Sequence, residues 1–118
     1  MTTAEELRTA AATLRARLAD PELTPGPWLS LDHGDRILYD GPGADDQPPV
    51  YVIDEPMSNG ANADYLELLH PGVGAALADW LEYHAATSAL LHAIVDGPTP
   101  ERDRYALAVA RAINGRPR

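Results

Sequence analysis

The 118-residue chain contains no cysteine, no lysine and no phenylalanine, so all nine of its basic residues are arginines. Without cysteine, the chain has no disulfides, thiolate metal ligands or cysteine nucleophiles. No apolar run approaches the roughly 18 residues that a membrane-spanning helix needs. The first residues also lack the basic start of a secretion signal. The sequence therefore predicts a cytoplasmic protein without membrane contact, folded as one domain over residues 1–118.

Negative charge is concentrated in one part of the sequence. Residues 20–67 carry eleven carboxylates and one cationic side chain, Arg36, which gives this segment a formal charge of −10. The whole chain has a formal charge of −9, so the rest is nearly balanced. A concentrated negative field repels nucleic acid and attracts cationic partners. We therefore expect no direct binding of nucleic acid and an acidic face that meets another protein.

Apolar residues recur with helical spacing in four segments. Thr2 or Thr3 followed by Glu5 or Glu6 is a capping-box pattern, which predicts the start of the first helix. The expected helices span residues 3–19, 62–69, 72–95 and 100–114. The apolar stripe of the third expected helix includes Trp80, which we expect in the core. The stripe of the last helix is expected at Tyr105, Val109, Ala112 and Ile113.

Between the first two helices the hydrophobic period changes from 3.6 to 2, which is typical of strands. The expected strands span residues 28–32, 36–40 and 50–54. Three short strands form a small antiparallel meander, and helices must cover one of its faces because such a sheet is not stable bare. The sequence predicts an α+β fold in which one helix, three strands and three helices follow in order.

Two segments together resemble the ead-like family of small tailed-phage and prophage early-region accessory proteins. They are the corner Thr24-Pro25-Gly26-Pro27-Trp28 and the segment Asn62-Ala63-Asp64-Tyr65-Leu66-Glu67-Leu68-Leu69-His70-Pro71. The resemblance covers roughly residues 4–84. The chain has Leu66-Glu67 where the family usually has Ile-Ala. The resemblance implies a phage or prophage context and an accessory role, and it implies no particular biochemical activity.

Several residues are candidates for binding, each with a structural alternative. Trp28 is either an aromatic platform or a core residue. Asp45 and Asp46 either bind a cation or are solvated loop charges, and Asn62 with Asp64 either receives an anion at a helix N-terminus or caps it. The full set of candidate binding residues is Trp28, Arg36, Asp45, Asp46, Tyr51, Asn62, Asp64 and Tyr65.

The histidines do not match a metal-site pattern. His84 and His92 are eight residues apart, about 12 Å along a helix axis, which is too far for both to bind one ion. We expect no metal, no cofactor and no catalytic residues, and we interpret His84 as a half-buried, hydrogen-bonded helix residue. The sequence predicts a protein that is not an enzyme.

The leading hypothesis is a phage or prophage accessory protein that binds a host or phage protein through its acidic face. The alternative is a protein that binds or sequesters a nucleotide-like ligand, using Trp28, Tyr51 or Tyr65 for stacking and Arg36 for charge. A homodimer through the helix at 72–95 is also expected, because one small sheet covers only part of the apolar surface of the helices.

Overall fold

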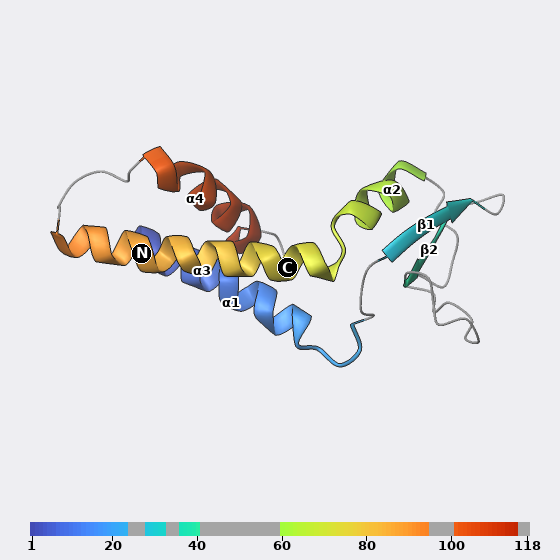
Figure 1. Ribbon diagram of the computed structural model, residues 1–118, viewed down its shortest axis with the longest axis horizontal. Helices are drawn as coiled ribbons and strands as arrows, with labels where there is room; N and C mark the ends of the chain where they lie inside the picture. The colour runs from blue at the N-terminus through green and yellow to red at the C-terminus, as the bar shows by residue number, and fades with distance from the viewer. Residues whose placement is uncertain (24–27, 33–35, 41–59, 95–100, 116–118) are drawn as a thin grey trace. The chain divides into compact units, whose positions relative to one another are not determined.

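A computed structural model of the chain describes residues 1–23, 28–32, 36–40, 60–94 and 101–115 (Figure 1). The helices are α1 (Thr3–Leu18), α2 (Gly60–Leu68), α3 (Pro71–Ile94) and α4 (Glu101–Asn114). The strands are β1 (Trp28–Asp32) and β2 (Arg36–Asp40). Each helix begins and ends within two residues of the bounds expected from the sequence.

The predicted α+β fold is wrong, because the chain is mostly α-helical. Helices of 16, 9, 24 and 14 residues compare with two strands of five residues each. The third expected strand, at 50–54, lies outside the described residues. The buried core consists of helical residues from α1, α3 and α4, so these helices cover one another and need no sheet beneath them.

The chain divides into two compact units, and the single domain expected over residues 1–118 stays a prediction. The helical unit combines Met1–Ala19 with Ala75–Arg118, and the acidic unit is the continuous segment Asp20–Gly74. Within the described residues, no helix combines the length and the apolarity that crossing a membrane requires.

In the helical unit, α1, α4 and most of α3 pack side by side (Figure 1). Alanine dominates the contact, and its small side chain lets the backbones of α1 and α4 approach closely. The buried cluster consists of Leu7, Ala10, Ala11, Leu81, Ala85, Ala106 and Ala110.

The buried side of α4 agrees only in part with the side that the sequence predicts, since Val109 and Ile113 pack against the core as expected. Ala106 and Ala110 are fully buried, whereas Tyr105 and Ala112 are exposed. Trp80 of α3 was also expected in the core, yet 36% of its surface is exposed. The two large aromatic residues expected in the core lie outside the buried cluster, which consists of alanine and leucine side chains.

The start of α1 confirms the capping prediction. Thr2 is the N-cap, and its hydroxyl oxygen accepts a hydrogen bond of 3.1 Å from the backbone N–H of Glu5. This bond satisfies one of the N–H groups that the first turn of a helix leaves without an intrahelical acceptor.

In the acidic unit, β1 and β2 pair antiparallel, and α2 contacts both strands. The register places Trp28 opposite Asp40 and Asp32 opposite Arg36. The helix α2 begins at Gly60, so Asn62 lies inside its first turn. The prediction that Asn62 caps this helix is therefore wrong.

Candidate interaction surface

The side of α2 that carries Ala61, Asp64, Tyr65 and Leu68 is exposed. These residues follow the spacing i, i+3, i+4 and i+7, so they share one side of the helix. Tyr65 is 62% exposed and Leu68 is 71% exposed. We call this set, with the neighbouring exposed Asn62, the α2 face. It combines a carboxylate, an amide, a phenol ring and a leucine, which suits contact with a partner that is partly basic and partly apolar.

Three of the residues predicted to bind come together on the α2 face, namely Asn62, Asp64 and Tyr65. Trp28 is half-buried at the first position of β1. Arg36 is the first residue of β2 and lies at the other end of the hairpin from Trp28. The paired strands therefore do not place the predicted stacking ring and the predicted cation at one position.

The remaining predicted binding residues are Asp45, Asp46 and Tyr51, and all three lie outside the described residues. The evidence for an acidic face is therefore the charge of the sequence, together with the described carboxylates of the acidic unit. Asp20, Glu22 and Asp64 are exposed among these.

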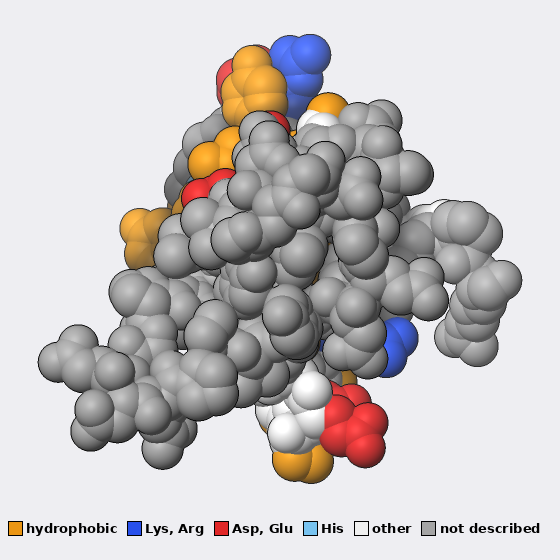
Figure 2. All heavy atoms as spheres, turned by 90° about the vertical axis from the view of Figure 1, so that its right-hand side faces the viewer, with side chains coloured by type: hydrophobic (Ala, Val, Ile, Leu, Met, Phe, Trp, Pro, Cys, Tyr) orange, Lys and Arg blue, Asp and Glu red, His pale blue; other side chains and the backbone are white. Residues whose placement is uncertain are grey.

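The concentration of charge follows the division into units. The acidic unit holds eleven carboxylates and one arginine, a formal charge of −10, whereas the helical unit holds eight arginines and seven acids. Exposed hydrophobic side chains lie beside charged ones at the surface (Figure 2). One compact unit thus carries nearly all of the net charge of the chain.

A second candidate site lies in the helical unit, where His84 of α3 meets Asp103 of α4. Nδ1 of His84 lies 3.0 Å from Oδ1 of Asp103. The Asp103 side chain is fully buried and the His84 side chain is 15% exposed, which confirms the interpretation of His84 as a half-buried, hydrogen-bonded residue. A buried carboxylate that accepts from an imidazole fixes the orientation of the ring.

Two aromatic rings of α3 lie nearly perpendicular to this imidazole. The ring centroids of Trp80 and His84 are 5.1 Å apart, and those of Tyr83 and His84 are 5.6 Å apart, both in T-shaped geometry. Such edge contacts are favourable between aromatic rings. Across the described ranges, no group of three or more His, Cys, Asp or Glu side chains is placed to hold a metal ion. The described contacts give His84 a positioning role for the two rings.

Sequence reasoning missed Asp103, although a signal for it was present. Asp103 is three residues before Ala106 and seven before Ala110, so it lies on the alanine side of α4 that faces the core. An acid on the apolar side of an amphipathic helix is expected to have a buried partner. His84, on the preceding helix α3, is the partner of Asp103.

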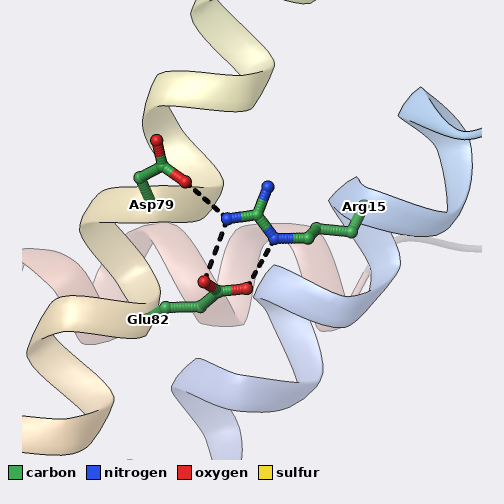
Figure 3. A network of polar contacts seen from close by, with 3 residues as sticks. All are labelled: Arg15, Asp79 and Glu82. Carbon is green, nitrogen blue, oxygen red and sulfur yellow. Dashed lines mark hydrogen bonds and ion pairs between the residues drawn. The ribbon is translucent and has the colours of Figure 1, made fainter.

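A third polar contact links α1 to α3 through Arg15 (Figure 3). Nε of Arg15 donates to Glu82 at 2.6 Å, and Nη2 donates to the other carboxylate oxygen at 2.9 Å and to Asp79. The hydrogen bonds that Arg15 donates lower the pKa of Glu82, and donation to the Glu82 and Asp79 carboxylates raises the pKa of Arg15. This paired geometry holds the two helices in one register.

The resemblance to the ead-like phage proteins depends on segments that lie largely in the acidic unit. It remains a prediction from the sequence, as do the phage and prophage context and the accessory role. Comparison of the chain with protein-family models, with curated proteins and with solved structures found no match.

Proposed function

We propose that the protein binds a partner protein through its acidic unit and has no catalytic activity of its own. The single observation that supports this most is the agreement between charge and fold: a formal charge of −10 belongs to one compact unit. We infer that the partner is a host or phage protein with a basic surface, met in the cytoplasm of the host cell. The resemblance to phage accessory proteins agrees with this role.

The α2 face is the part of the acidic unit that we propose as the contact. Carboxylates steer a cationic partner toward the surface, and salt weakens this attraction. Tyr65 and Leu68 supply exposed apolar area beside Asp64. Tyrosine is enriched among the residues that contribute most to binding energy. The charge therefore accounts for the rate of encounter and Tyr65 for the lifetime of the complex.

Retention from host lysate on the immobilised full chain, at low and at high salt, identifies a partner, which is then purified and titrated. We expect the double variant Glu22→Gln/Asp64→Asn to slow association, and Tyr65→Ala to weaken binding by about 30-fold, the value for a residue worth about 2 kcal/mol. The matched control is Glu5→Gln/Glu101→Gln, which removes two exposed acids from the helical unit. Equal effects of the two double variants would contradict the proposal.

A nucleotide-like ligand is the alternative function, and the same protein tests it. A ligand that binds only the folded state raises the melting temperature. Thermal unfolding against a panel of nucleotides separates the two functions. A nucleotide-dependent rise that Tyr65→Ala removes would favour the alternative.

A further inference from the structure

The helix α3 carries a row of exposed residues on the side away from the core. Its buried residues are Ala78, Leu81, Ala85 and Ser88. This row, here called the α3 stripe, consists of Ala76, Trp80, Tyr83, Thr87, Leu90 and Ile94, of which Thr87 is half-buried and the others are exposed. The four large side chains of the stripe are between 36% and 71% exposed. A side of a helix that faces only solvent seldom carries four large apolar side chains in one row.

The spacing of the stripe is 4, 3, 4, 3 and 4 residues, which is the heptad pattern by which two helices pack as a coiled coil. A narrow seam of this kind differs from the broader apolar side by which a helix covers a globular core. The helix has 24 residues and is therefore about 36 Å long. The length of α3 and the heptad spacing of the stripe are both suited to pairing with another helix along the whole stripe.

The stripe also has the polar and conformational properties of an interface. Thr87 is the one threonine or serine of the stripe, and its hydroxyl donates a hydrogen bond of 2.9 Å to the backbone oxygen of Tyr83. Thr87 therefore buries its hydroxyl without losing a hydrogen bond. The rings of Trp80 and Tyr83 are held against His84, which Asp103 fixes in turn. Side chains that are already ordered lose less conformational entropy on association.

We propose that the stripe binds the same stripe of a second copy of the chain, with the two α3 helices antiparallel. Pairing about a two-fold axis near Ala85 places Trp80 opposite Leu90 of the second copy. It also places Tyr83 opposite Thr87, and Ile94 opposite Ala76. Each pair joins a larger side chain to a smaller one, as close packing of facing layers requires.

Charge selects the antiparallel arrangement. The acidic unit ends at Gly74, in the first turn of α3, so the chain ties it to the N-terminal end of the stripe. Parallel helices would bring the two chain junctions at Gly74, each leading into a segment with a formal charge of −10, to the same end of the pair. Antiparallel helices place these junctions at opposite ends, where like charges held near them repel less.

The other described helices do not offer a comparable seam. The apolar sides of α1 and α4 are already buried in the core. The helix α2 has nine residues, which is too short to pair along the whole stripe. The second copy is therefore the occupant that presents a matching stripe of equal length.

Sedimentation equilibrium of the full chain over a range of concentrations tests the dimer. We expect a mass twice the 12.7 kDa of the chain, and we expect Tyr83→Glu and Leu90→Glu each to give a monomer of unchanged helical content. The matched control, Tyr105→Glu, changes an exposed tyrosine of α4 outside the stripe and should leave the dimer intact. A monomer at high micromolar concentration, or a dimer that survives both stripe variants, would overturn the proposal.

Single cysteines test the direction of pairing, because the chain has none of its own. Ala76→Cys mixed with Ile94→Cys should form a disulfide-linked pair of unlike chains, whereas each variant alone should not. Linked pairs from each variant alone would show parallel helices and overturn the antiparallel arrangement. If the wild type is monomeric and Tyr83→Glu instead abolishes binding of another protein, the stripe serves that protein and the proposed dimer is wrong.

Discussion

Nδ1 of His84 lies 3.0 Å from Oδ1 of Asp103, and this contact joins α3 to α4 beside the alanine core. Asp103 is fully buried, so removing its carboxylate leaves the imidazole without this acceptor. The two residues are 19 apart in the sequence and lie on successive helices. Variants of Asp103 therefore measure how much this contact contributes to the packing of α4 against α3.

Replacing Asp103 by Ala should lower the free energy of unfolding by about 1–3 kcal/mol, the cost of a buried polar group that loses its partner. Asp103→Asn retains an acceptor oxygen of similar size and should cost less. Urea denaturation followed by circular dichroism measures both. Glu101→Ala, at an exposed position of the same helix, is the control and should change little. A loss in Glu101→Ala equal to that in Asp103→Ala would contradict a specific role for the buried contact.

The contact between Arg15 and Glu82 predicts a dependence of stability on pH. Hydrogen bonds from Arg15 lower the pKa of Glu82 in the folded chain, so the unfolded chain binds the proton more readily. The contribution of the pair is therefore present above the unfolded pKa of about 4.3 and is lost as the pH falls through the folded value.

Glu82→Gln should accordingly be less stable than the wild type at pH 7, and the difference should shrink as the pH falls below about 4. Thermal unfolding at pH 7 and at pH 3 measures it. Glu5→Gln, at another exposed position, serves as the control at both pH values. A difference between wild type and Glu82→Gln that stays constant across this range would argue against the ion pair as its source.

The close approach of α1 and α4 depends on alanine. Ala106 is fully buried, and a leucine there has no space, so Ala106→Leu should lower the free energy of unfolding by about 1–3 kcal/mol. Ala108→Leu makes the same change at an exposed position of α4 and should be nearly neutral. Chemical denaturation of the two variants decides the matter. Equal stability of both would mean that the two helices adjust their spacing freely.

The N-cap of α1 predicts a graded series. Thr2→Ala removes the acceptor for the N–H of Glu5 and should cost about 1 kcal/mol, whereas Thr2→Ser keeps the hydroxyl and should cost much less. The free energy of unfolding of the three proteins gives the series. A Thr2→Ser variant as unstable as Thr2→Ala would show that the hydroxyl does not act as a cap.

The sequence predicts where helices begin and end better than which side of them is buried. Local chemistry sets the ends: Thr2 caps α1, and the Gly97-Pro98 pair follows the end of α3. Which side of a helix is buried depends on the helix that packs against it, and α1 presents alanine side chains to α4. Tyr105 was therefore assigned to the core by its hydrophobicity, although Ala106 occupies that place.

The candidate sites show the same division. The sequence places Asn62, Asp64 and Tyr65 near one helix start, and all three are exposed there, while their role in binding stays a prediction. The partnership of His84 with Asp103 was not expected from the sequence, because it joins residues from two helices whose packing the spacing along one helix does not reveal. The α+β prediction failed for a related reason: alternation over five residues predicts a strand, as at β1 and β2, but it does not reveal how far helices dominate the described residues.

The packing of α1 against α4 has a consequence for the order of events as the chain leaves the ribosome. Residues 19–100, 82 in all, separate the two helices, so the alanine surface of α1 lacks its α4 counterpart until synthesis is nearly finished. The segment Asp20–Gly74 is continuous and has all of its own residues much earlier. We therefore expect nascent chains that stop before α4 to protect β1, β2 and α2 from protease while α1 stays open to cleavage.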